Sequence, residues 1–365
     1  MLLLCRMSQQ RFLSSIGAGA SPARVRRVLI GLYLFAALGD AVGKAVTANA
    51  SIGTALARNL PGNAAPTIDS SHVLKGTFQI FRAASRRLLH GEDLYTPYPE
   101  KHSDRFKYSP TFALLFAPLA WLPWPLGLFL WSALNALVLF AAVEQLLPAR
   151  QANFALACLL LEVLRSMQTA QSNALVAALI VLAFIALEHG RAWRAAGAVV
   201  LGAFIKIFPL AALTFAIPRR KTLQVAVAAL VVGVVLAVAP LLVATPTQLI
   251  AHYRSWMFTE SHDALERWFS VMALIHQLFG TEWPNWPVQL VGTLFLLLPL
   301  AIRRDRWSDE RFRMTYLCSV LVYLTLFNHQ AERASYLIAF VGASIWFLLR
   351  RRAEAWAPTY DFAGG

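Results

Sequence analysis

The chain has 365 residues, of which 58% are hydrophobic and only 14% are charged. A soluble domain averages about 45–50% apolar and about 25% charged residues, so this composition excludes an ordinary soluble protein. The net charge of +14 does not indicate a nucleic-acid partner, because the basic residues form short runs beside apolar segments, as the positive-inside rule describes. These runs are Arg24–Arg27, Arg219–Lys221, Arg303–Arg306 and Arg350–Arg352.

Apolar segments of membrane-helix length recur along the sequence. About 20 apolar residues in a helix cross ~30 Å of hydrocarbon, so we expect an all-α polytopic membrane protein with about 9–11 membrane segments. The segments lie at about 27–47, 108–123, 125–147, 152–168, 173–188, 195–217, 223–245, 286–302, 313–328 and 333–350. Residues 24–350 would then form one transmembrane domain between two cytoplasmic tails, 1–23 and 351–365.

Two long polar connections, 48–107 and 246–285, interrupt the apolar segments. If the basic runs lie in the cytoplasm, both connections lie on the extracytoplasmic face. Simple alternation would place Arg191 and Arg194 outside, against the charge rule. We favour an alternative in which 195–217 folds back on itself near Lys206–Pro209 and 108–123 is also incomplete, because broken helices are tolerated where they line a protein cavity.

The first polar connection ends in an amphipathic segment, 76–90. Its basic residues fall on other faces than its apolar ones, which indicates either an interfacial helix facing lipid phosphates or a loop helix with solvated charges. The apolar residues are Phe78, Phe81, Ala84 and Leu88, and the basic residues are Arg82, Arg86 and Arg87.

Aromatic rings and carboxylates are interleaved in the loop that follows, at Tyr95, Tyr98, Phe106 and Tyr108 beside Glu92, Asp93, Glu100, Asp104 and Lys107. Rings can stack on the apolar face of a sugar while acids hold its hydroxyl groups. The alternative interpretation is an aromatic belt at the membrane interface.

Lys206 interrupts an apolar span, and Pro209 breaks the helix beside it. A lysine within a membrane segment usually has a partner or marks a functional path. We interpret Lys206 as an anchor for a phosphate, and the alternative is a lysine that snorkels from a helix end.

Two further polar patches lie between apolar segments. The patch Gln168–Asn173, with Gln171 and Asn173, is typical of hydrogen bonds between membrane helices. In the turn 328–333, His329 and Glu332 could reach one substrate, or they could cap a helix and pair with a neighbouring cation.

The second polar connection carries Trp256, Trp268, Trp283 and Trp286 among His252, His262, Asp263 and His276. Neither these histidines nor Cys5, Cys158 and Cys318 have metal-ligand or disulfide spacing. We therefore expect neither a metal site nor a cofactor.

Several short motifs, in order, resemble those of one family. They are Leu89–Tyr95, Phe106–Pro110, Leu119–Pro123 with Trp131, Gln171–Asn173 and Lys206–Pro209. This order resembles glycosyltransferase family 87, the polyprenyl-phosphate-sugar-dependent membrane enzymes with a GT-C fold, over roughly 70–350. The resemblance implies inverting transfer of mannose, or another hexose or pentose, from a polyprenyl phosphate donor to an envelope glycolipid or polysaccharide at the extracytoplasmic face.

The resemblance also implies roles for single residues. Lys206 matches the family's Lys-x-x-Pro motif and would stabilise the phosphate leaving group, with Arg82 and Lys107 assisting. Where the family has an Asp-Phe pair that would supply the base, this chain has Thr77-Phe78, and threonine is no base at neutral pH. The substitutes are Asp104 and Glu332, then Asp69, Asp40 and His329. The other substrate contacts would be Tyr95, Tyr108, Gln171 and Asn173.

Two other functions compete with transfer. A glycolipid transporter or flippase would bind the same lipid without reacting, but such proteins often show internal repeats and none is visible here. An inactive relative that serves as a partner subunit would explain Thr77. The gathering of polar residues in loops on one side favours an enzyme.

Overall fold

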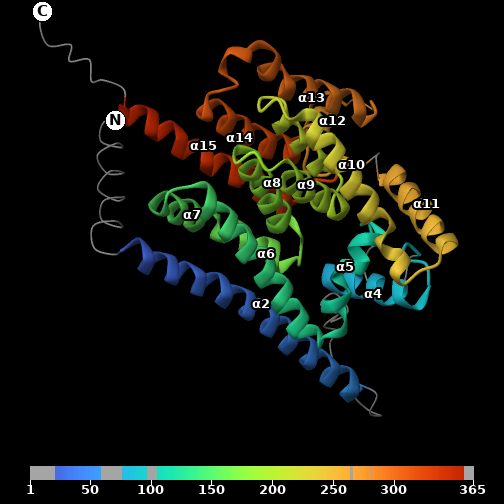
Figure 1. Cartoon of the computed structure of the whole chain (residues 1–365). Coiled ribbons are helices and arrows are strands. Elements are labelled where there is room, and N and C mark those ends of the chain that lie inside the picture. The colour runs from blue at the N-terminus through green and yellow to red at the C-terminus, as the bar shows by residue number, and fades with distance from the viewer. Residues whose placement is uncertain (1–20, 59–75, 97–104, 264–265, 281, 357–365) are drawn as a thin grey trace, which may run out of the picture.

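The computed structural model describes residues 21–58, 76–96, 105–263, 266–280 and 282–356. Within these ranges the regular structure is entirely helical, which confirms an all-α polytopic membrane protein (Figure 1). The elements are α2 (Pro22–Arg58), α4 (Thr77–His90), α5 (Pro110–Trp121), α6 (Trp124–Leu146), α7 (Ala149–Gln168), α8 (Asn173–Glu188), α9 (Ala192–Ile205), η1 (Phe208–Ala216), α10 (Thr222–Val238), η2 (Ala239–Leu242), α11 (Pro246–Asp263), α12 (Val271–Phe279), α13 (Asn285–Ile302), η3 (Arg304–Arg306), α14 (Glu310–Leu326), η4 (Arg333–Ser335) and α15 (Tyr336–Trp356).

Every predicted apolar segment corresponds to a helix or to two consecutive helical pieces. In the described ranges, five of them are long and apolar enough to cross a membrane: Pro22–Ala48, Trp124–Leu146, Thr222–Leu242, Asn285–Ile302 and Arg333–Arg350. The apolar helices α5, α8 and α9 are shorter. At 1.5 Å per residue, α8 and α9 are only about 24 and 21 Å long, less than the ~30 Å of a hydrocarbon core, so they fall short of complete spans.

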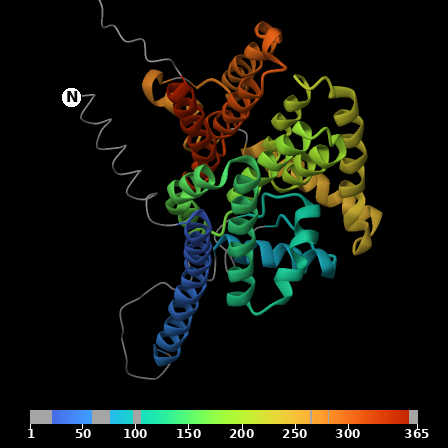
Figure 2. The same cartoon turned by 60° about the vertical axis from the view of Figure 1, so that its left-hand side comes forward.

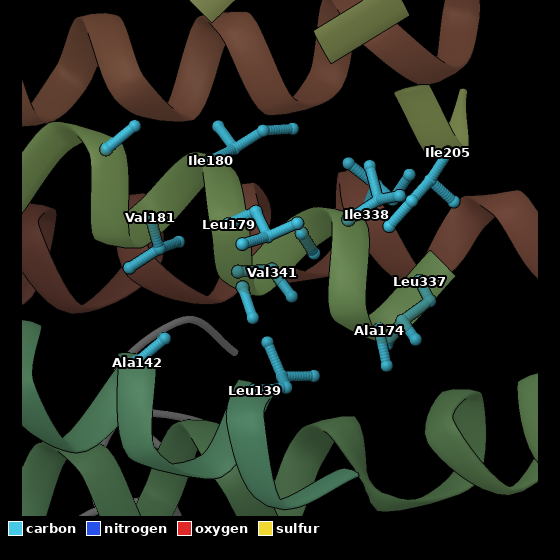
Figure 3. Packing of buried hydrophobic residues seen from close by; sticks show 14 of the residues in the cluster. Leu139, Ala142, Ala174, Leu179, Ile180, Val181, Ile205, Leu337, Ile338 and Val341 are labelled. Atoms are coloured by element: carbon cyan, nitrogen blue, oxygen red, sulfur yellow. The ribbon is translucent and has the colours of Figure 1, made fainter. Parts of the chain in front are cut away.

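The core is built around α8, which is apolar on all sides and buried along most of its length. Figure 3 shows Leu179 of α8, Val341 of α15 and Leu139 of α6 in one cluster of buried side chains. Lipid tails are as apolar as these side chains, so close packing rather than escape from water holds membrane helices together. Small residues allow that packing: α8 buries Ala174, Ala177, Ala178 and Ala183.

Large apolar side chains also cover much of the outer surface. On α10, Leu223 and Leu230 are 77% and 69% exposed, and on α13 Phe295 is 68% exposed. A soluble protein would not leave whole helices apolar on the outside, whereas lipid tails are suitable neighbours for these faces. Figure 2 shows the end of the long helix α2 reaching past the other helices.

The segment after α8 folds back on itself, as the sequence analysis favoured. The α-helix α9 ends at Ile205, and the 3₁₀ stretch η1 begins at Phe208. Beyond η1, Arg219 Nη2 donates to the carbonyl of Glu188 (2.8 Å) and Lys221 Nζ donates to the carbonyl of Gly190 (2.8 Å). Because Glu188 and Gly190 directly precede α9, both ends of the segment meet, and Lys206 lies at the far tip.

Two ion pairs join helices near their ends. One of them lies where the folded-back segment begins. Arg313 of α14 holds the Glu188 carboxylate through Nε (2.8 Å) and Nη2 (2.7 Å). Arg26 of α2 pairs with Glu144 near the end of α6. Basic residues cluster at these helix ends as the positive-inside rule describes.

Candidate active site

A polar cavity of about 540 Å³ lies at the tip of the broken segment. Its walls come from the start of α4, the residues before α5, the break between α9 and η1, the side of α11, and the turn between α14 and η4. The cavity thus unites the parts of both polar connections that the structure describes with the apolar segment that carries Lys206.

Lys206 projects from extended backbone (φ −144°, ψ 132°) just after α9. Its Nζ donates to Asn173 Oδ1 (2.9 Å) and to Gln171 Oε1 (3.4 Å), at the start of α8. A snorkelling lysine would instead extend toward water or headgroups. The two amides therefore hold the ammonium in the cavity, and the predicted patch Gln171–Asn173 is the partner that the sequence left unidentified.

Gln171 is the centre of a small hydrogen-bond network. Besides accepting from Lys206, its Oε1 accepts from the Tyr108 hydroxyl (3.3 Å), and its Nε2 donates to Glu332 Oε2 (3.0 Å). The backbone just before it is held by two bonds, from Gln171 N to Ser166 O (2.9 Å) and from Trp131 Nε1 to Ala170 O (2.9 Å). Ala170 adopts a left-handed conformation (φ 52°), which ends α7 and aims Gln171 into the cavity.

The turn 328–332 contributes His329 and Glu332. Glu332 is exposed, accepts from Gln171 and caps η4 in a capping box with Ser335. The capping interpretation is thus confirmed, while contact of Glu332 with a substrate stays a prediction. The amide of Gln289 donates to Phe327 O (3.3 Å) and lies 3.1 Å from His329 Nδ1. With Nδ1 accepting from that amide, a neutral His329 carries its proton on Nε2.

The Nε2 atom of His329 is buried and has no hydrogen-bond partner among the described residues. Burial lowers the pKa of His329, although the charges of Asp263 and Glu266 oppose that shift. At neutral pH the ring is therefore neutral, and its Nε2–H is a free donor at the cavity wall for an oxygen of a bound molecule.

The α11 side of the cavity is acidic, and the sequence analysis missed its main residue, Glu260. This half-buried side chain lines the cavity, and burial together with the charge of Asp263 raises the pKa of Glu260. Gln330 Nε2 lies 3.5 Å from Glu260 Oε2 and 3.4 Å from Asp263 Oδ2. The spacing Trp256, Glu260, Asp263 places all three on one helical face, which is the signal that could have revealed the group.

Lys107 lines the cavity but differs from Lys206 in its partners. Its Nζ lies 3.0 Å from Asp263 Oδ2 and 3.9 Å from Glu266 Oε2, and Trp256 Nε1 donates to its carbonyl (3.3 Å). The positive charge of Lys107 is thus largely balanced by carboxylates. Its clearest effect in the structure is to join the residues before α5 to α11.

Three other predicted substrate contacts have different positions. Tyr108 lines the cavity. Tyr95 is buried behind it and donates to the Tyr108 carbonyl (2.8 Å), so it supports Tyr108 rather than lining the space. Asn173 is buried and reaches the cavity only through Lys206.

Arg82 does not reach the cavity. Its Nε and Nη2 donate to the carbonyls of Ala120 (3.3 Å) and Leu122 (3.0 Å), and Arg86 also donates to Ala120 (3.1 Å). The predicted phosphate contact of Arg82 is therefore wrong in this structure: the two arginines satisfy the orphan carbonyls at the end of α5. The apolar face of α4, with Phe78 and Phe81, packs on α5.

The remaining base candidates lie elsewhere or outside the described ranges. Asp69 and Asp104 are among the residues that the structure does not describe. Asp40 pairs with Lys44 on α2 (2.8 Å) and does not line the cavity. Within the described part of the chain, no three His, Cys, Asp or Glu side chains are arranged to hold a metal ion.

Thr77, where the resemblance led us to expect an aspartate, is the first residue of α4 and lines the cavity. The carboxylates of Glu260, Glu266 and Glu332 line the same space. The cavity therefore has three carboxylates in its wall, although residue 77 is a threonine.

Comparison with known proteins agrees with this architecture. No curated protein sequence matches the chain. The model of glycosyltransferase family 87 matches residues 106–327, more than half of the chain, and this range includes Lys107, Lys206 and Glu260. The chain therefore belongs to glycosyltransferase family 87.

Proposed function

We propose that this membrane glycosyltransferase moves a sugar from a polyprenyl phosphate to a hydroxyl group of an envelope glycolipid or polysaccharide, with inversion, at the extracytoplasmic face. The observation that carries the proposal is the Lys206 ammonium, which neutral amides hold in a polar cavity at the tip of a broken apolar segment. A fixed cation at this depth suits the anionic headgroup of a lipid.

The chemistry requires little beyond charge and position. The acceptor oxygen bonds to the anomeric carbon, the bond from that carbon to the phosphate oxygen breaks with its electron pair, and the hydroxyl proton moves to a carboxylate. The leaving group is already a phosphate, so it needs positive charge rather than a general acid. Lys206 supplies that charge, and the free Nε2–H of His329 is a second donor for a phosphate or sugar oxygen.

We assign the base to Glu260. The Glu332 carboxylate already accepts from Gln171 and caps η4. We therefore give Glu332 a positioning role for Gln171 and, through Gln171, for Lys206. The side chains of Trp256 and Gln330 both bond the Glu260 carboxylate, with Gln330 Nε2 3.5 Å from Oε2. Glu260 also lines the cavity, where an acceptor hydroxyl can reach its remaining lone pairs. A raised pKa also makes Glu260 a stronger base than an ordinary glutamate.

The variant Glu260→Gln is expected to lower kcat by about 10²–10⁴, the range for loss of a general base. In the unmodified protein the rate falls as the pH drops through the pKa of Glu260, because the protonated carboxyl cannot accept the hydroxyl proton. Since that pKa is raised, the loss of rate begins at a higher pH than for an ordinary glutamate. Initial rates across a pH series measure both effects.

Glu282→Gln is the control, because this glutamate lies in the same polar connection with an 82% exposed side chain. It should leave the rate and its pH profile unchanged. An unchanged rate in Glu260→Gln, combined with a loss in Glu332→Gln that follows the acid limb of the profile, would transfer the base role to Glu332.

If the cavity faces the extracytoplasmic side, the two ends of the bundle should differ in their accessibility to a reagent outside the cell. In a background without native cysteines, Glu282→Cys should react with a membrane-impermeant maleimide in intact cells. Arg304→Cys, in the basic run after α13, should react only after the cells are permeabilised. The reverse pattern would place the cavity on the cytoplasmic face.

A transfer assay separates the proposal from its two alternatives. Purified protein receives labelled polyprenyl-phosphate sugars and a panel of acceptor lipids. A glycosylated product supports the proposal, whereas movement of donor across vesicles without product identifies a flippase. The absence of product with every donor, together with a stable complex with another transferase, identifies a partner subunit, the alternative that Thr77 motivates.

A further inference from the structure

A second cavity, an apolar groove of about 430 Å³, runs between α13, α14 and α15. Two of its walls, α13 and the α15 segment, are candidate membrane spans, and they lie with α14 in the C-terminal third of the chain (Figures 1 and 2). Its lining is apolar apart from a few polar groups. Of these, the Ser319 hydroxyl donates to Thr315 O (3.1 Å) and the Tyr323 hydroxyl pairs with Thr293 Oγ1 (2.6 Å). The groove thus offers no free hydroxyl to a polar molecule.

The groove and the polar cavity share a wall. Tyr323 and Phe327 line both spaces, and their rings stack with centroids 5.3 Å apart. Gly292 allows this arrangement, since a Cβ atom there would come within 2.3 Å of the Phe327 ring. The apolar groove therefore lies directly against the cavity that holds Lys206, with the side chains of Tyr323 and Phe327 between the two spaces, and it continues along α14.

The groove also opens outward. Phe295 and Trp346, on opposite walls, are 68% and 45% exposed on a surface that we assign to lipid. From Phe327 to Cys318 it follows α14 for about 14 Å at 1.5 Å per residue. A long flexible apolar chain could enter from the bilayer while its head remained at the cavity.

We propose that this groove binds the isoprenoid chain of the donor next to its phosphate. The inference rests on the proposed function, because that function places the phosphate at Lys206. It goes further in assigning the lipid to the α13–α15 side of the bundle rather than to the faces of α2 or α10, which also expose apolar residues. Van der Waals contact with the groove would then fix the donor relative to the acceptor.

The test is photolabelling of the full chain in vesicles with a polyprenyl phosphate that carries a photoreactive group on an isoprene unit near the phosphate. The matched probe is the same photoreactive polyprenol without phosphate. Peptide mass spectrometry should locate the phosphate probe on α13–α15, with about tenfold less labelling for the alcohol, a ratio equivalent to about 1.4 kcal/mol. Val322→Trp and Ala343→Trp, which fill the groove from α14 and α15, should each reduce that labelling about tenfold.

Leu298→Trp is the control, since this exposed α13 residue does not line the groove. It should leave labelling unchanged, and thermal unfolding should show that all three variants remain folded. Labelling spread evenly over lipid-facing helices, concentrated at another helix pair, or insensitive to both groove variants would overturn the proposal. Equal labelling of the groove by the phosphate probe and the alcohol probe would also overturn it, because the occupant would then be ordinary membrane lipid.

Transfer measured in the same vesicles separates this proposal from the function on which it rests. Transfer that requires Lys206, combined with labelling outside the groove, would leave the proposed function standing and reject the groove. Phosphate-dependent labelling of the groove without transfer to any acceptor would support the groove and reject the proposed transfer.

Discussion

Lys206→Met should reduce sugar transfer by about 10²–10³, the usual effect of losing one preorganised stabiliser of transition-state charge. Methionine keeps the length of the side chain but removes the ammonium that Asn173 and Gln171 hold. The negative charge that develops on the departing phosphate would then lose the one cation that neutral amides hold, because Lys107, which also lines the cavity, is paired with the carboxylates of Asp263 and Glu266. Initial rates with a polyprenyl-phosphate sugar give the size of the loss.

The fold should tolerate this change. The two lost hydrogen bonds are offset by the removal of a charge from an apolar segment, which is itself unfavourable. Lys221→Met is the matched control, because Lys221 lies at the opposite end of the same folded-back segment and binds only a backbone carbonyl. Full activity in Lys206→Met, or an equal loss in Lys221→Met, would remove Lys206 from the reaction.

The largest effect on stability is expected from Arg313→Met. Arg313 is 5% exposed, binds both oxygens of Glu188 and donates to the carbonyl of Trp307 (2.9 Å). Removal of one partner of a buried ion pair costs about 3–5 kcal/mol, and a loss of about 3 kcal/mol, the lower end of that range, is expected here because Arg219 Nε remains 3.9 Å from Glu188 Oε1. Because Glu188 ends α8 and its carbonyl receives Arg219, the loss would loosen the base of the segment that presents Lys206.

The free energy of unfolding in detergent measures this effect. Arg306→Met is the control: Arg306 is exposed and pairs only with Asp305 and Asp309, so about 0–1 kcal/mol should be lost. The double variant Arg313→Met with Glu188→Gln should recover part of the stability, because it also removes the carboxylate charge, while Arg219 keeps its hydrogen bond to the Glu188 carbonyl. Equal losses in the Arg313 and Arg306 variants would contradict the structural role of the pair.

The helical segments were predictable because a membrane imposes one simple rule on sequence. Backbone groups in lipid must bond within a helix, so apolar runs and helices coincide. The break at Lys206 was predictable for a related reason, since a lysine and Pro209 in one apolar span both oppose a continuous helix. The pairing of Lys206 with the patch Gln171–Asn173 was not, because it depends on how α8 packs beside α9.

The errors at the site also concern contacts between distant segments. Arg82 looked free to bind phosphate, but the carbonyls at the end of α5 occupy it. Glu260 was not among the residues that the sequence singled out, and the packing of α11 beside the residues before α5 brings it to the cavity. Local pattern thus locates elements and unusual residues, while their partners depend on tertiary structure.

The most direct test is an experimental structure of the protein with polyprenyl phosphate bound. The account predicts the phosphate in the polar cavity with an oxygen about 3 Å from Lys206 Nζ, the distance of a charge-assisted hydrogen bond. A phosphate bound elsewhere, with Lys206 still held by Asn173 and Gln171, would contradict it.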